Sequence, residues 1–277
     1  MNYRWIRLGH HLLGYAGLVL LAMWTLLPLG WMVAVSLMPS GAASTSPVPL
    51  WPDTPTLVQY ATLFAHFHMA RYLANSLIIS GSITLGALLL NAMAGYAFAV
   101  LRFRGREALL RLLLMALLIP IHITILPLFL MLRAMGLINS YLGVILPNLA
   151  SVLGIFLMYQ FMRTLPLSLI EAARMDGASE FQIFWRVALP LSRPMLASVG
   201  MLTFLGAWND FLWPLVVLTQ HTHYTLPVAL ANLAGEHVQD VELMMAGSVV
   251  TILPVLLLFL GLQRFYLPVL LRSGLAG

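Results

Sequence analysis

Six long apolar stretches constrain the fold of this chain more than any other feature of its sequence. A helix needs about 20 mostly apolar residues to cross roughly 30 Å of hydrocarbon. The six stretches are that long, and they lie at residues 12–37, 73–101, 109–132, 142–163, 194–218 and 243–268. Charged residues make up only 8% of the chain, against about 25% in soluble domains. We therefore expect an all-α membrane protein with six transmembrane helices in a single domain over residues 1–277.

The basic residues fall almost entirely on one side of these spans. The chain has 14 basic residues and no lysine, so all of them are arginine. One side carries Arg4, Arg7, Arg102, Arg104, Arg106, Arg111, Arg163, Arg174, Arg186, Arg193, Arg264 and Arg272, and the other side carries Arg71 and Arg133. Basic residues collect in cytoplasmic loops. This asymmetry predicts that both termini and the loop at 164–192 face the cytoplasm, whereas the loops at 38–72, 133–141 and 219–242 face outward.

Two residue types are missing, and their absence excludes several chemistries. Without cysteine the chain has no disulfide, thiolate metal site or redox pair. Without lysine it cannot form the phosphate-binding loop G-x-x-x-x-G-K-[ST], so any ATP chemistry must reside on another polypeptide. The H-x-H pair at His66 and His68 would point to opposite sides of a helix, which makes it a poor metal site. We expect no catalytic residue, metal or cofactor on this chain.

The segment 164–190 is polar, unlike the apolar spans around it, and its local signals predict two short helices. Ser168 with Glu171, and Ser179 with Gln182, have the spacing of a capping box, in which two side chains satisfy the first amides of a helix. Gly177 lies between the two helices, where a residue with positive φ commonly ends a helix.

The second of these helices has an apolar stripe. Phe181, Phe184, Trp185 and Ala188 follow the i, i+3, i+4, i+7 spacing of one helical face. Such a face most often packs against the protein's own core. The same spacing also suits docking into a groove of a partner protein. The periodicity by itself leaves both interpretations open.

The full segment EAARMDGASEFQIFWRVALP, residues 171–190, resembles the EAA loop of ABC importer permeases, E-A-A-x₃-G-x₉-I-x-L-P, with Val187 in place of isoleucine. The resemblance continues through QYATLFAHF (59–67), YLANSLIIS (72–80), AGYAFAVLRFRGR (94–106), GLINSYLGVILPNLA (136–150), FLGAWNDFLWPLVVL (204–218) and YTLPVALANL (224–233). Together these stretches are similar to the second permease subunit of carbohydrate-uptake importers, the maltose/glycerol-3-phosphate permease type.

This resemblance implies a type I ABC importer permease fold in the cytoplasmic (inner) membrane of a bacterium or archaeon. It also implies a homologous permease partner, a dimer of ATP-binding subunits that hold ATP and magnesium, an extracytoplasmic solute-binding protein and a sugar substrate, but no nucleic acid. Residues 164–192 would form the cytoplasmic coupling loop. Its ATPase-docking residues would be Glu171, Ala172, Ala173, Asp176, Gly177, Phe181, Phe184, Trp185, Leu189 and Pro190, with Glu171 meeting a basic group of the ATPase and Gly177 forming the bend.

Asp210 is the one acid well inside an expected span, and an ionisable residue there indicates a functional site because its burial in lipid is costly. With its polar and aromatic neighbours it suggests a sugar pathway lined by Asn75, Asn148, Trp208, Asn209, Asp210 and Trp213. Consecutive helical residues point 100° apart, so residues 208–210 cannot all face one cavity. The competing interpretation is that Asp210 and the asparagines form structural hydrogen bonds between helices.

Three other functions deserve comparison with the sugar permease. An ABC permease for a non-sugar solute would share the coupling loop. An ion-coupled secondary transporter typically has several intramembrane acids and internal repeats, but this chain has Asp210 alone and no recognisable repeat. An intramembrane serine protease would need a Gly-x-Ser-Gly nucleophile motif, which the sequence lacks.

Overall fold

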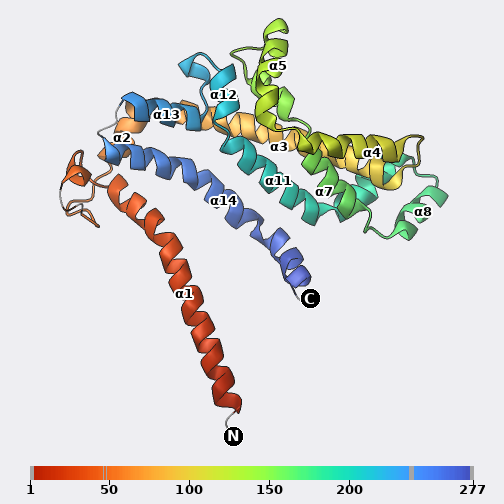
Figure 1. Ribbon diagram of the computed structural model, residues 1–277, viewed down its shortest axis with the longest axis horizontal. Coiled ribbons are helices and arrows are strands. Elements are labelled where there is room, and N and C mark those ends of the chain that lie inside the picture. The colour runs from red at the N-terminus through yellow and green to blue at the C-terminus, as the bar shows by residue number, and fades with distance from the viewer. Residues whose placement is uncertain (1–2, 46, 48, 237–239, 275–277) are drawn as a thin grey trace. The chain divides into compact units, whose positions relative to one another are not determined.

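The structure is a computed structural model that describes residues 3–45, 47, 49–236 and 240–274 (Figure 1). All regular elements within these ranges are helical. Helices α1 (Tyr3–Ser36), α3 (Met69–Val100) and α14 (Val241–Gly274) each contain an unbroken apolar span long enough to cross a membrane. The extreme termini, expected in the cytoplasm, lie outside the described residues.

The remaining expected spans are bent pairs of shorter helices. The pairs are α4 (Arg106–Met115) with α5 (Ile121–Ala134) at 105°, α6 (Tyr141–Ile145) with α7 (Val152–Met162) at 41°, and residues 180–191 with α11 (Arg193–Trp208) at 80°. If each bent pair counts as one span, the described residues hold six spans, which is the number expected. The third pair begins inside the loop expected at 164–192, so that part of the polar loop continues into a membrane helix.

The continuous helix expected at 194–218 is interrupted. Helix α11 ends at Trp208, and α12 (Leu212–Val217) begins after a short break. The cause is Pro214, because proline has no N–H for the carbonyl four residues earlier and its ring clashes with that carbonyl. The residue four positions before Pro214 is Asp210, which lies in the break.

The other short elements complete the loops. They are α2 (Val58–Ala65), α8 (Leu167–Met175), α9 (Glu180–Ile183), a π-helical turn (Phe184–Ala188), α10 (Leu189–Leu191), α13 (Leu226–Glu236), and 3₁₀ turns at Ala42–Ser44, Ala116–Leu118, Leu146–Asn148 and His221–His223. Helices α8 to α10 belong to the segment that the sequence singled out as polar.

The chain divides into two compact units, residues 1–69 with 230–253 and residues 70–229 with 254–277, and the single permease domain expected from the sequence stays a prediction. In the first unit, Val35 and Met38 at the end of α1 pack around Ala43. Every residue from 14 to 29 of α1 is exposed, although nearly all of them are apolar. Helices in lipid gain nothing from hiding apolar side chains within one chain, so a long helix with few internal contacts is an ordinary outcome here.

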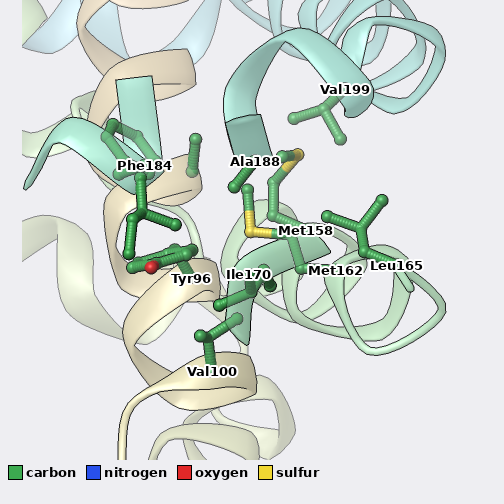
Figure 2. Packing of buried hydrophobic residues seen from close by; sticks show 11 residues of the cluster. Tyr96, Val100, Met158, Met162, Leu165, Ile170, Phe184, Ala188 and Val199 are labelled. Carbon is green, nitrogen blue, oxygen red and sulfur yellow. The ribbon is translucent and has the colours of Figure 1, made fainter. Parts of the chain in front are cut away.

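The core of the second unit joins the polar loop to the membrane helices (Figure 2). Tyr96 and Val100 of α3 and Met158 of α7 are buried together with Ile170 of α8 and Phe184 of the π-helical turn. A side chain from each part of the loop therefore enters the same core as the ends of α3 and α7.

Helices α3 and α7 touch backbone to backbone at the edge of this core. A Cβ atom added to Gly95 would lie 2.6 Å from the Cβ of Met158 and 2.9 Å from the backbone nitrogen of Tyr159. Small residues permit this close approach between membrane helices. Gly95 thus sets the spacing of the two helices that support the loop.

Candidate functional site: the coupling loop and a polar groove

Helix α8 begins two residues earlier than a Ser168 cap would allow. Its N-cap is Pro166, and no side chain caps the first amides. The Ser168–Glu171 capping box expected from the sequence is therefore wrong. Pro166 has an extended backbone there and is followed at once by helical residues, so Ser168 lies within the first turn and cannot precede it.

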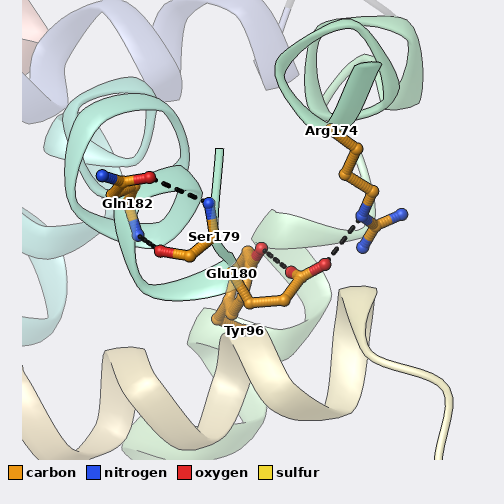
Figure 3. A network of polar contacts seen from close by, with 5 residues as sticks. All are labelled: Tyr96, Arg174, Ser179, Glu180 and Gln182. Carbon is orange, nitrogen blue, oxygen red and sulfur yellow. Dashed lines mark hydrogen bonds and ion pairs between the residues drawn. The ribbon is translucent and has the colours of Figure 1, made fainter. Parts of the chain in front are cut away.

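The end of α8 and the start of α9 follow the expected pattern. Gly177 has φ +81°, its N–H donates to the carbonyl of Arg174, and the N–H of Ala178 donates to the carbonyl of Ala173. These two bonds form a Schellman motif, which satisfies the last carbonyls of a helix. The Ser179–Gln182 capping box is confirmed, with both of its hydrogen bonds present (Figure 3). Hydrogen bonds therefore satisfy the end of α8 and the start of α9 at this joint.

One face of α8 is free of contacts with the rest of this chain. Ile170 is 1% exposed, whereas Met175 is 88% exposed. Among the expected docking residues, Glu171, Ala172, Asp176 and Gly177 are exposed and Ala173 is half-buried. Four of these five residues are therefore available to a partner.

The aromatic stripe of the expected docking face is split between the core and the surface of this chain. Phe184 is 3% exposed and its ring lies 5.4 Å from that of Tyr96, so it faces the core of this chain. Phe181 and Trp185 remain exposed and contact each other edge to face, with centroids 6.0 Å apart. Consecutive helical residues point about 100° apart, so Phe184 can face the core while Trp185 remains on the surface. Leu189 and Pro190 are half-buried.

A network that sequence reasoning missed ties the loop to α3 (Figure 3). Glu180 Oε1 accepts a hydrogen bond from Nε of Arg174 at 2.7 Å, and Oε2 accepts one from the hydroxyl of Tyr96 at 2.7 Å. The bond from Arg174 lowers the pKa of the Glu180 carboxyl, partial burial opposes this, and the bond from Tyr96 lowers it further. The ion pair of Glu180 and Arg174 is thus ionised at neutral pH. Because both side chains are more than 40% exposed, solvent screening limits its stabilisation to about 1 kcal/mol or less.

A polar-edged groove of about 240 Å³ lies between α3, α7 and α11. Asn148, Ser151, Thr203 and Asp210 supply its polar lining, and the other lining residues are Ile83, Leu153, Gly154, Leu157, Val199, Leu202, Gly206 and Ala207. No basic side chain lines it. Two of the six pathway candidates, Asn148 and Asp210, are thereby brought together. The spacing of Thr203, Gly206 and Asp210 at i, i+3 and i+7 is a sequence signal that could have found this face.

Asp210 has a structural task as well as a place in the groove. Its Oδ1 accepts a hydrogen bond from the backbone N–H of Trp213 at 3.3 Å, so it satisfies an amide in the first turn of α12 from the residue before the N-cap, Phe211. Neighbouring Asn209 is exposed, lies outside the groove and donates only to the carbonyl of Leu205 in its own helix. Asp210 therefore lines the groove and Asn209 does not, a difference that the sequence alone did not show.

Three other pathway candidates lie outside the groove. Trp208 is buried and stacks on Phe204, and Trp213 is buried in a second hydrophobic cluster. Asn75 is buried, donates to the carbonyls of Thr222 (3.0 Å) and Tyr224 (2.9 Å), and accepts from the hydroxyl of Tyr141 (2.6 Å). The amide of Asn75 is thus used in holding the loop that contains Thr222 and Tyr224. Within the described residues, no group of three or more His, Asp or Glu side chains has metal-binding geometry.

Solved structures share this arrangement of helices. A chain of the crystal structure of a bacterial ABC transporter involved in the import of the acidic polysaccharide alginate superposes with a TM-score of 0.81 at 24% identity, covering 93% of this chain and 98% of that one. A chain of the inward-facing MetNI methionine ABC transporter gives a TM-score of 0.51 at 17% identity, covering 71% and 93%. The fold is that of a type I ABC importer permease.

Sequence relatives identify the family. Residues 87–270 match the model of the binding-protein-dependent transport system inner membrane component. The arabinooligosaccharides transport system permease protein AraQ of Halalkalibacterium halodurans is 37% identical, covering 96% of this chain and 95% of the relative. The diacetylchitobiose uptake system permease protein NgcG of Streptomyces coelicolor is 34% identical, covering 91% and 84%. This chain belongs to that family of transport inner membrane components, and it is an integral, multi-pass permease subunit of an ABC transporter.

Proposed function

We propose that this chain, with a homologous permease subunit, forms the translocation pathway of an ATP-driven, binding-protein-dependent importer for a sugar or oligosaccharide. The observation that carries the proposal is the coupling loop, whose capped, glycine-jointed helices enter the core on one face and are exposed on the other. The sugar class is supported by relatives named for arabinooligosaccharides and diacetylchitobiose transport at 34–37% identity.

The exposed side of the loop is the docking surface for an ATP-binding subunit in this proposal. Glu171, Ala172 and Asp176 of the α8 region, together with Phe181 and Trp185, present an acidic and aromatic surface. A groove with a basic rim and an apolar floor would complement it. ATP and magnesium would be held by that partner, since this chain has no lysine for a phosphate-binding loop. The permease itself would be non-catalytic.

The coupling loop would act as a lever in the transport cycle. When two ATP-binding subunits approach one another, each would move the helix docked in its groove. Because Ile170 and Phe184 enter the core that includes α3 and α7, movement of the loop would be carried to the membrane helices. Opening toward the outside would then receive the solute from an extracytoplasmic binding protein, and hydrolysis would return the helices to their starting positions.

The groove between α3, α7 and α11 is where this chain would contact the solute. Hydroxyl and amide groups from Asn148, Ser151 and Thr203 suit a ligand rich in hydroxyls. The carboxylate of Asp210 accepts hydrogen bonds from sugar hydroxyls, and no basic side chain lines the groove. This charge pattern favours a neutral sugar over an anionic one.

Reconstitution with the partner proteins tests the proposal. The complex is purified in lipid nanodiscs, and its ATPase rate is measured with the binding protein and a panel of arabino-oligosaccharides, chito-oligosaccharides, amino acids and short peptides. We expect stimulation by a neutral oligosaccharide and by no amino acid or peptide. Stimulation by an amino acid or peptide would instead show a non-sugar ABC permease. Uptake driven by an ion gradient without ATP would overturn the importer assignment.

The Asp210→Asn variant tests the groove. Asparagine retains an oxygen that can cap α12, but hydrogen bonds to a neutral group are weaker than those to a charged one by about 1 kcal/mol. We expect the KM for uptake to rise roughly fivefold at unchanged thermal stability. The matched control is Asn209→Ala, since Asn209 lies one residue away and outside the groove. If KM were the same in Asp210→Asn and the parent, Asp210 would be a helix cap alone.

A further inference from the structure

We propose that Glu180 is a positioning residue, which fixes the direction of α8 against α3 by bridging Arg174 and Tyr96. The inference rests on the proposed docking role of α8. It identifies the residues that would prevent this helix from rotating about its contact at Ile170. Neither Glu180 nor Tyr96 is among the residues of the loop motif or of the docking surface.

Helix α8 is weakly attached by its own packing. Ile170 is its one buried side chain, Ala173 is half-buried, and its other side chains are exposed. A single buried contact acts as a pivot, about which a short helix can turn. Arg174 lies four residues beyond Ile170 on the same face, about 6 Å along the axis. A second attachment at Arg174 therefore removes the rotation that a pivot at Ile170 allows.

Glu180 provides that second attachment, because its two carboxylate oxygens go to two different helices. Oε1 meets Arg174 of α8, and Oε2 meets Tyr96 of α3, each at 2.7 Å (Figure 3). Charge-assisted hydrogen bonds of this length are stronger and more directional than neutral ones. Tyr96 is itself immobile, since it is 4% exposed and packs against Phe184.

Helix α3 makes this attachment useful for transport. It has no break between Met69 and Val100. Asn75, about 32 Å from Tyr96 along the helix axis, binds the backbone of the outer loop at Thr222 and Tyr224. One rigid helix thus connects the attachment of α8 to a loop on the opposite side. If α8 swivelled on Ile170, part of the movement imposed by a docked ATPase would be lost before reaching α3.

Spin labels test the positioning role in the permease alone. The chain has no cysteine, so Met175→Cys on α8 and Met93→Cys on α3 can be labelled selectively in the full chain in nanodiscs. We expect a narrow distance distribution in the parent and a broader one in Glu180→Gln and in Tyr96→Phe. Glu107→Gln, which removes an exposed acid from the first turn of α4, is the matched control and should remain narrow. A narrow distribution in Glu180→Gln would overturn the inference.

Coupling is tested in the assembled complex with AMP-PNP as the probe. The readout is the rate at which a water-soluble maleimide labels Leu202→Cys, an exposed position in the groove. We expect the change in labelling rate that AMP-PNP causes to be roughly threefold to fivefold smaller in Glu180→Gln than in the parent. An exposed ion pair shifts a conformational equilibrium by about that factor. The charge-swapped double variant Arg174→Glu/Glu180→Arg should restore the change in labelling rate. Such a recovery would exclude misfolding as the cause of the loss in Glu180→Gln.

The two measurements separate this inference from the importer proposal. A full AMP-PNP effect in Glu180→Gln would show that Glu180 does not transmit movement, while the importer proposal would stand. If AMP-PNP had no effect in the parent complex, the importer proposal would fail. The distance distribution of the isolated permease would still decide whether Glu180 fixes α8.

Discussion

The Gly95→Leu variant is expected to lose the packing of α3 against α7 and to disappear from the membrane fraction. Even a single Cβ at this position would lie 2.6 Å from Met158 Cβ and 2.9 Å from a backbone nitrogen of α7. Overpacking of a core costs about 1–3 kcal/mol even where flexible side chains can move aside. Here the obstacle includes backbone, so Gly95→Ala should cost about 3 kcal/mol and leucine more. That is a large share of a total stability of about 5–15 kcal/mol.

Gly81 offers a control on the same helix. A Cβ at Gly81 would meet nothing within 4 Å. Alanine in a helix interior is favoured over glycine by about 0.5–1 kcal/mol, so Gly81→Ala should be neutral or slightly stabilising. Membrane abundance and thermal unfolding in detergent measure both variants. Similar losses in Gly81→Ala and Gly95→Ala would show that glycine is needed for a reason other than close helix contact.

The Gly177→Pro variant is expected to abolish ATP-driven uptake while the permease still inserts into the membrane. Proline fixes φ near −65°, whereas residue 177 has φ +81°, and its N–H, which proline lacks, donates to the carbonyl of Arg174. The Schellman motif would be lost, and α8 would leave the joint in a different direction. Gly177→Ala is milder, because a left-handed backbone costs a non-glycine residue about 1–2 kcal/mol and the added Cβ meets no neighbour.

Gly105 is the matched control for this strain. It has φ +83° and open space around its Cβ, and it precedes α4 in the other arginine-rich loop. Gly105→Ala therefore carries the same backbone cost away from the proposed docking surface. Uptake into proteoliposomes and co-purification of the ATPase are measured for both alanine variants. We expect a reduction in Gly177→Ala only, and an equal reduction in Gly105→Ala would contradict a specific role of the joint in coupling.

Local signals predicted the parts of the molecule that depend on neighbouring residues. Long apolar runs indicated six spans, and the described residues hold six when bent pairs are counted as one. The Ser179–Gln182 box and the glycine at 177 were readable because a cap involves residues only a few positions apart. The Ser168 box was misread for the same reason, since a capping spacing can also occur inside the first turn of a helix.

Side-chain roles in the candidate site were harder to predict. Phe184 and Trp185 have the same character and share a predicted face, but Phe184 is buried against Tyr96 and Trp185 is exposed. Asn75 and Asn148 are both polar residues in apolar spans, and yet only Asn148 lines the groove. Glu180 carried no sequence signal, because its partners lie six and 84 residues away along the chain.

The sequence by itself determined that the chain resides in a membrane and that the polar loop contains a glycine joint, whereas the side that each loop faces stays a prediction. Those properties follow from hydropathy, charge and short-range hydrogen bonding, which act over a turn or a helix. Only the tertiary structure decided which polar groups face a groove, which aromatic residues remain exposed, and that Glu180 joins α8 to α3. These depend on contacts between distant segments, and the break before Pro214 places Asp210 at the groove.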